Sequence, residues 1–328
     1  FGKVRVFAGP GRLPAMQAVS PTQPNDASDA VRPIHGFVDS PGRIAYGVGG
    51  RSVGQVEQLP AQGSRMLLGV RRSLEWLAAQ GAGGAMVTVV RDGAAVWPSE
   101  LTKDSPRWFG GVGVPQRQRD VLELLCRLYE REGMQFVPAL SFNAPVPSLE
   151  VLLARGSQQE GSQAGILLVG EDGKPRRLSG RPTALHYNIL DPRVQHVVES
   201  FVGEVIDRVG ESRAVKGVSL VLSHDGWLHL PGVAWGLDDI TFARFANDVG
   251  IESGAGEDRF SQRAAFVRGP GKDMWLSWRS RELSSFYSRL GGMVSVKDHE
   301  KVLYVAPTTL LSLGELASRL RPSLAEKP

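Results

Sequence analysis

Apolar positions in residues 65–310 follow two alternating patterns, one typical of amphipathic helices and the other of buried strands. Arg65–Gln80 places apolar side chains at helical spacing, and a glycine cluster stops the pattern. Ala85–Val90 follows as a largely apolar run, which is typical of a strand buried on both faces. The same pairing recurs three times and predicts a parallel α/β domain, with helices at Asp120–Glu132, Pro192–Val209 and Met274–Leu290 and strands at Gln135–Leu140, Gly217–Leu222 and Val302–Ala306.

The first 64 residues differ from this pattern because they are rich in glycine, proline and serine. Short extended runs at Val4–Phe7 and Arg43–Val48 are separated by turn signals. We therefore expect residues 1–64 to form a β-rich N-terminal segment that lies against a main domain of residues 65–328. The chain begins with Phe1 rather than methionine, which we interpret as a piece of a longer chain that carries further domains.

Two local sequence patterns predict further structure in the middle of the chain. Gly165–Val169 and Pro175–Leu178 flank the turn sequence Gly170–Gly173, which predicts a β-hairpin inserted between the second and third units. Asp191 precedes a helical pattern with Pro192 in its first turn, so Asp191 is expected to cap that helix.

The alternation of helices and strands fits a barrel better than a nucleotide-binding sheet. No glycine-rich dinucleotide fingerprint follows the first strand, and no P-loop occurs anywhere in the chain. The length of the units, with large loops after each strand, resembles a (β/α)8 TIM-type barrel. Four clear units and a fifth around Tyr187 fit before a final predicted helix at Leu310–Leu320. We therefore predict an incomplete or irregular barrel.

Composition narrows the possible chemistry. The single cysteine, Cys126, lies in an apolar run and is expected to be a buried core thiol, which excludes an internal disulfide and a cysteine-built metal site. No apolar run is long enough to span a membrane. The net charge of +4 comes from scattered basic residues, so we expect no nucleic-acid partner. No residues have metal-ligand spacing, and we expect no metal and no cofactor.

Polar and aromatic side chains gather just after the predicted strands, where barrel enzymes carry their active residues. Carboxylates can protonate a glycosidic oxygen or attack an anomeric carbon, polar groups bind hydroxyls, and indole faces stack on sugar rings. The expected partner is therefore a carbohydrate. The candidate substrate-binding residues are Asp92, Asn143, Tyr187, Asn188, His224, Trp227, His229, Trp235 and Arg279, and the candidate catalytic residue is Asp225.

Several segments resemble the family 10 glycosyl-hydrolase-like proteins, which are bacterial (β/α)8 barrels. The resemblance covers about residues 65–310. It implies that Asp225, at the end of the fourth strand, acts as an acid or a nucleophile, and that the protein is exported to the cell envelope or beyond. The segments that carry it are Lys216–Trp227, Leu230–Gly232 and Trp235–Asp239, supported by Asp120–Glu123, Phe136–Pro138, Tyr187–Val194 and Trp275–Arg279.

Three functional interpretations stay open at this point. The first is hydrolysis of a polysaccharide or glycan, and the second is a non-catalytic glycan-binding or structural barrel in a larger surface protein. The third is an interaction surface, in which a partner closes the incomplete barrel. The Asn-Glu pair of many barrel glycosidases is missing after the fourth strand, and Asp225 with Gly226 could simply form a turn. A second carboxylate could come from Asp92, Asp238, Asp239, Glu257 or Asp258, although the Asp238–Asp239 pair is more simply a cap for a helix at Ile240–Val249.

Overall fold

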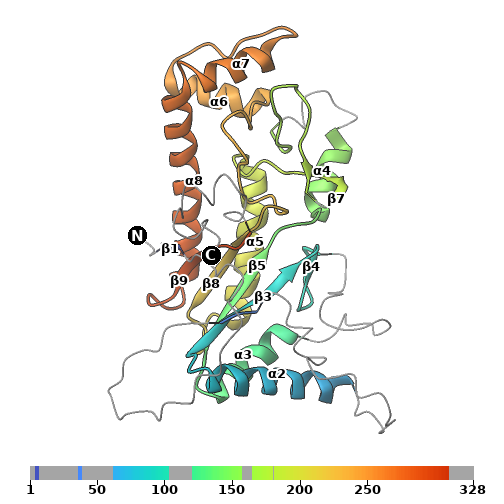
Figure 1. The fold of residues 1–328 in the computed structure, drawn as a ribbon, viewed down its shortest axis with the longest axis vertical. Helices are drawn as coiled ribbons and strands as arrows, with labels where there is room; N and C mark the ends of the chain where they lie inside the picture. Colours follow the sequence, from blue (N-terminus) through green and yellow to red (C-terminus); the bar gives the residue numbers. More distant parts are fainter. Residues whose placement is uncertain are drawn as a thin grey trace, which may run out of the picture.

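The computed structural model describes residues 4–6, 36–38, 62–102, 120–156, 165–179 and 181–309. Its centre is a parallel sheet, and the helices that connect its strands pack against it (Figure 1). A short strand, β4 (Ala94–Ala95), pairs antiparallel with the end of β3. The parallel strands lie in the spatial order β2 (Gly36–Val38), β3 (Gly84–Arg91), β5 (Gln135–Ser141), β8 (Gly217–Leu222), β9 (Val302–Pro307) and β1 (Val4–Val6).

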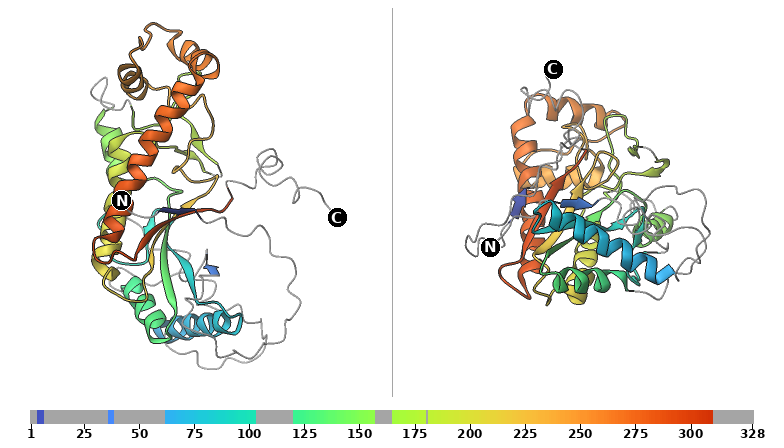
Figure 2. Two further views of the ribbon diagram at one scale, coloured as in Figure 1. Left: turned by 90° about the vertical axis from the view of Figure 1, so that its left-hand side faces the viewer. Right: turned by 60° about the horizontal axis from the view of Figure 1, so that its bottom comes forward.

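The strand order is that of a barrel. Strands β2, β3, β5, β8 and β9 are neighbours in chain order, and the first strand, β1, pairs with the last one, β9. A flat sheet built in sequence would place β1 beside β2, whereas a sheet that curls into a ring brings its first and last strands together. Figure 2 shows this curvature in the strands. Within the described residues β1 and β2 do not pair, so a complete eight-stranded barrel is not seen and the fold is a mixed α/β fold around a parallel sheet.

The helices that connect the strands pack side by side on one face of the sheet (Figure 1). Their apolar sides meet strand residues such as Val89, Phe136 and Leu220 in one large core. The opposite face carries a smaller cluster of Met86, Val137 and Ala306. The covering helices are α2 (Gln62–Ala79), α3 (Val121–Arg131), α5 (Pro192–Val209) and α8 (Lys272–Ser295), and each packs on the next in this order.

Two insertions rise above the sheet at the end where its strands finish. The first holds β6 (Arg177–Leu178) and β7 (Arg181–Leu185), and the predicted hairpin before them is confirmed by antiparallel pairing of Val169 with Pro175. The second holds α6 (Asp239–Val249) and α7 (Arg259–Arg268), which pack with the start of α8. Its core contains Trp275 and Trp278, whose rings stack with centroids 5.4 Å apart.

Capping side chains mark the starts of two of the predicted helices. Helix α5 begins at Pro192 as predicted, and Asp191 caps it by accepting a hydrogen bond from the backbone N–H of Arg193. Asp238 caps α6 in the same way, through the N–H of Thr241.

Two helices were missed. Helix α4 (Pro147–Gly156) starts in a proline-rich stretch that reads as a loop, and α7 is largely polar. The predicted helix Leu310–Leu320 and the extended run Arg43–Val48 lie outside the described residues.

Candidate active site

Three neighbouring strands, β3, β5 and β8, place polar side chains at one edge of the sheet. Asp92 follows β3, Asn143 follows β5 and Asp225 follows β8. The amide of Asn143 holds Asp92 at two points: its Oδ1 accepts from the Asp92 backbone N–H at 2.8 Å, and its Nδ2 donates to Asp92 Oδ1 at 3.1 Å. Asp92 has a φ of 53°, an uncommon backbone conformation for a residue other than glycine. The surrounding contacts therefore hold Asp92 in one specific, strained position.

Asp225 completes this group from the side of β8. Its partial burial raises its pKa, but the side chains of Ser223 and Asn143 beside the carboxylate outweigh burial, and the net pKa lies below the ordinary value. Asp225 is therefore ionised at neutral pH. The backbone N–H of Gly226 donates to the carbonyl of Ser223 at 3.1 Å and closes a turn that contains Asp225.

Asn143 thus acts on both acids: it hydrogen-bonds to Asp92, and it helps to lower the pKa of Asp225. Sequence patterns placed each of the three residues at a strand end, but nothing in them indicated that one amide joins the two acids.

The end of the last strand meets the same group. Thr309, just past β9, accepts a hydrogen bond from the backbone N–H of His224 at 3.2 Å, and its hydroxyl lies 2.9 Å from His224 Nδ1. His224 is partly exposed and lies next to Asp225 in the chain. The ends of β3, β5, β8 and β9 therefore share one rim.

Trp227 and Tyr187 lie beneath the rim. Trp227 is 0% exposed, and its Nε1 donates to the Ala144 carbonyl at 3.1 Å. Its ring packs against Phe142 at 5.0 Å and Tyr187 at 5.2 Å between centroids. Protein atoms thus surround the indole that was predicted to stack on a sugar, so in this structure Trp227 supports the loop that carries Asn143.

The hydroxyl of Tyr187 supports the same loop. It accepts from the backbone N–H of Val146 at 3.0 Å and donates to Glu150 at the start of α4. Burial raises the pKa of Tyr187 well above its ordinary range, and the hydrogen bond to Glu150 adds to this effect. The phenol is therefore protonated at any physiological pH and acts through these hydrogen bonds.

Asn188 and Arg279 fasten the loop between β8 and α6. Asn188 Nδ2 donates to Asp238 Oδ2 at 3.1 Å and to Thr241 Oγ1 at 2.8 Å. Arg279 Nη1 donates to the carbonyls of Gly232 and Val233, at 2.9 and 3.2 Å, and its burial lowers its pKa to about 10. Both residues were predicted to bind substrate, and the structure places both against the protein itself.

A basic group lies on the other side of the rim, between the hairpin insertion and the β8–α6 loop. The rings of His186 and His229 meet edge to face with centroids 5.3 Å apart, and the Arg176 guanidinium lies 5.9 Å from the ring of Trp235. Burial, with Arg176 nearby, lowers the pKa of His186 to about 3 and that of His229 to about 4. Arg176 was not predicted as a site residue, because no local pattern connects the hairpin with this loop.

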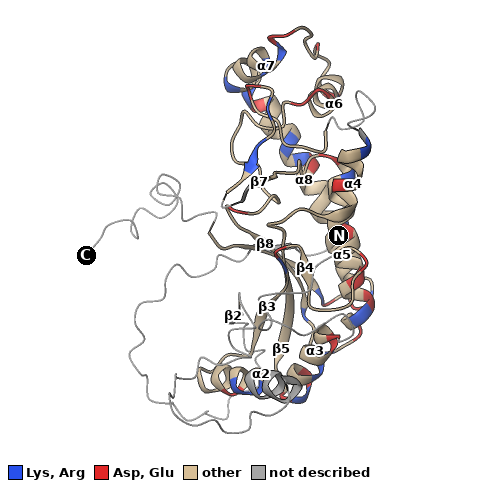
Figure 3. Cartoon of the chain, turned by 90° about the vertical axis from the view of Figure 1, so that its right-hand side faces the viewer, with Lys and Arg blue, Asp and Glu red and all other residues tan. Residues whose placement is uncertain are grey.

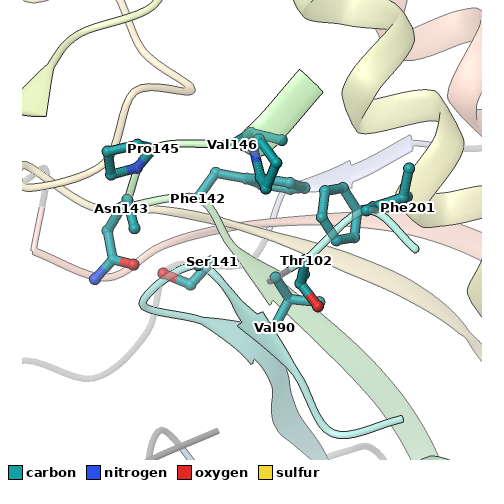
Figure 4. A pocket seen from close by; sticks show the side chains of 12 residues that line it. Val90, Thr102, Ser141, Phe142, Asn143, Pro145, Val146 and Phe201 are labelled. Atoms are coloured by element: carbon teal, nitrogen blue, oxygen red, sulfur yellow. The ribbon is translucent and has the colours of Figure 1, made fainter. Parts of the chain in front are cut away.

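A small pocket opens between the ends of β3 and β5 and helix α5 (Figure 4). Figure 4 shows Phe142 and Phe201 side by side on one wall, with Ser141 and Asn143 away from them. The space holds about one water molecule, so it is too small for a sugar ring. A sugar would have to bind along the rim itself.

The described residues were also compared with what a metal site and a membrane-spanning helix require. Within them, no group of three or more histidine, cysteine, aspartate or glutamate side chains is arranged to hold a metal ion. No helix in this part of the chain is long and apolar enough to cross a membrane.

Comparisons with known proteins place the fold in one class. No protein-family model and no curated protein matches the sequence, so the family 10 resemblance has no support from a family model. The glycoside hydrolase domain of PgaB (BpsB) from Bordetella bronchiseptica has a similar structure, with a TM-score of 0.51 and 16% identity over 83% of this chain. This chain spans 65% of the length of that structure. Alpha-L-fucosidase isoenzyme 2 from Paenibacillus thiaminolyticus gives a TM-score of 0.42 at 12% identity, over 83% of this chain and 32% of the fucosidase chain.

The first of these similarities shows a glycosidase-like α/β fold. At such low identity it says nothing about which residues act or on which substrate.

Proposed function

We propose that this chain hydrolyses glycosidic bonds of a polysaccharide or glycan at the rim formed by β3, β5 and β8. The observation that carries the proposal is the position of Asn143, which hydrogen-bonds to Asp92 and helps to lower the pKa of Asp225. Glycoside hydrolysis needs two carboxyl groups on either side of the scissile bond. The similarity to a glycoside hydrolase domain supports the same class of reaction.

The environments of the two acids suggest different roles. Asp225, whose pKa is lowered, suits the nucleophile, which must be ionised when it attacks the anomeric carbon. Asp92 is then the acid that protonates the leaving oxygen and later takes a proton from the attacking water. With Asp225 as the nucleophile, the proposed reaction is a retaining one, which requires the two carboxyl groups to lie ~5–5.5 Å apart. Asn143 is its positioning residue.

We also propose where this reaction takes place and what else the chain carries. Polysaccharides are met mostly outside the cytoplasm, which fits an exported protein at the cell envelope or beyond, with further domains in the same longer chain. The non-catalytic alternative is favoured by one observation, the hydrogen-bonded turn that contains Asp225 and Gly226. In that alternative the rim binds a glycan without cleaving it.

Release of reducing sugar from a panel of bacterial and algal polysaccharides tests the proposal. We expect Asp225→Asn and Asp92→Asn to lose about 10²–10⁴-fold in rate, the range typical of acid–base groups. Glu252→Gln removes an exposed carboxylate in the α6–α7 loop and is the matched control, with its rate unchanged. Glycan binding without turnover, equal in the wild type and Asp225→Asn, would contradict hydrolysis and leave a glycan-binding barrel.

A further inference from the structure

Three nitrogen atoms at the basic side of the rim are buried without a hydrogen-bond partner. They are Arg176 Nη1, His186 Nε2 and His229 Nδ1. Buried polar atoms nearly always find a partner, so three orphans in one group are unusual. Arg176 and His229 are each partly exposed, whereas His186 is fully buried. A ligand from solvent can therefore contact this group at the exposed parts of Arg176 and His229, whereas the three orphan nitrogens lie beneath the surface.

The orphans differ in what they can bind. Arg176 always carries a charge and only donates hydrogen bonds, and no carboxylate of the described residues forms an ion pair with it. His186 Nδ1 lies 2.8 Å from the Tyr187 carbonyl, which only accepts, so Nδ1 carries the hydrogen and Nε2 of the neutral ring is an acceptor. The group thus offers a cationic donor beside a neutral acceptor.

We propose that Arg176, His186, His229 and Trp235 form a subsite for a negatively charged sugar residue, one that bears a carboxylate or a sulfate ester. The anionic group binds the guanidinium of Arg176, since planar guanidinium pairs well with carboxylate and sulfate oxygens. The sugar ring lies near the indole of Trp235, and the two imidazoles lie beneath the bound anion. This inference rests on the proposed function, and it names the class of substrate.

The location supports a subsite of the same rim. The charge of Asp225 acts on His229, so the basic group lies within electrostatic range of the proposed nucleophile. Three backbone hydrogen bonds hold the short strands that present the group: His186 N–H to the Arg176 carbonyl at 2.8 Å, Arg176 N–H to the Leu168 carbonyl at 2.8 Å, and Leu168 N–H to the His186 carbonyl at 2.9 Å. Gly170 lies directly against the Trp235 ring, because a Cβ there would come within 2.9 Å of it. The subsite is therefore built on a fixed frame.

The test follows the imidazole NMR signals of His186 and His229 in the whole chain. Two anions, glucuronate and sulfate, and two neutral sugars, glucose and the methyl ester of glucuronate, are added in separate titrations. We expect saturable shifts with glucuronate or sulfate and none with the two neutral sugars. A response to glucuronate alone identifies a uronic acid, and one to sulfate alone identifies a sulfated sugar. Arg176→Gln should weaken binding about tenfold or more, since a charged hydrogen bond is lost. Arg177→Gln, which removes the next arginine along the chain, should leave binding unchanged.

Two results would overturn the subsite. One is the absence of any saturable shift with both anions, and the other is an equal response in Arg176→Gln that folds as the wild type does. Arg176→Lys keeps the charge and should retain part of the binding, which separates loss of the charge from loss of the fold. Shifts without any polysaccharide turnover would leave the subsite standing and reject the hydrolase. Turnover of a neutral polysaccharide without shifts would support the hydrolase and reject the subsite.

Discussion

The acidic and basic sides of the rim are organised in opposite ways. Asp92 is held by the Asn143 amide, and neighbouring polar side chains lower the pKa of Asp225, so this side is organised before any ligand arrives. The basic side leaves nitrogen atoms of Arg176, His186 and His229 buried without partners. Groups that are already satisfied are preorganised for chemistry, whereas unsatisfied buried groups raise the free energy of the free protein until a ligand binds. We therefore interpret the acidic side as the reacting centre and the basic side as the surface that recognises the ligand.

A second acidic region shows that charge alone does not make such a centre. Asp120, Glu123, Glu204 and Asp207 line a pocket together with Arg208. Figure 3 shows the acidic positions in red along α3 and α5. Arg208 lies 3.6 Å from Asp120, and Trp97 donates to Glu204 at 2.7 Å. These acids lie on the helical layer, away from the strand ends, and they belong to the packing of α3 and α5.

The largest expected effect is on the acidic side. Replacing Asn143 with leucine removes the amide that holds Asp92 and helps to lower the pKa of Asp225, and we expect kcat/KM to fall about 10²–10³-fold. Loss of the amide also raises the pKa of Asp225, so the acid limb of the pH–rate profile should move to higher pH. Asn143→Gln should restore part of the rate. An unchanged acid limb would mean that Asn143 does not act on Asp225.

The next effect concerns acid stability on the basic side. His186 has a pKa of about 3 in the folded chain and an ordinary value of 6.5 when unfolded. Because the folded pKa is lowered, the unfolded chain binds more protons below pH 6.5, and stability falls as the pH drops from about 6.5 towards 3. We expect His186→Gln to remove a loss on the order of 3 kcal/mol in the free energy of unfolding over this range.

Urea titrations at several pH values measure this slope. The exposed His299 is the matched control, and His299→Gln should keep the slope of the wild type. An equal slope in His186→Gln would show that the buried imidazole is not the group that takes up the proton. Asp225 contributes in a different window, because its lowered pKa makes its stabilisation disappear only as the pH falls through that folded value.

The smallest expected effect compares the buried Arg279 with the partly exposed Arg176. Arg279 is bonded to two carbonyls, so Arg279→Gln should lower the free energy of unfolding by about 2–3 kcal/mol. Arg176 has an orphan nitrogen, so Arg176→Gln should change stability by less than about 1 kcal/mol. Urea denaturation compares the two. If Arg176→Gln is as destabilising as Arg279→Gln, then Arg176 holds the fold and the contrast between the two sides of the rim is wrong.

The sequence predicted features that depend on neighbouring residues better than those that depend on packing. Helix α5 and strand β8 have their predicted bounds, since a cap at Asp191 and an apolar run are local signals. Asp92, Asn143 and Asp225 were predicted one by one because strand ends meet at one edge of a barrel. The shared amide, the burial of Trp227 and the approach of Arg176 to His229 come from contacts between distant segments, which no spacing along the chain reveals.

The most direct test of the central claim traps the intermediate on the proposed nucleophile. The protein is incubated with a 2-deoxy-2-fluoro glycoside of the sugar that it releases, digested, and analysed by mass spectrometry. The account predicts a glycosyl adduct on the peptide that contains Asp225, and no adduct in Asp225→Asn. Turnover with inverted stereochemistry and no adduct, or an adduct on another residue, would contradict the roles proposed for Asp225 and Asp92.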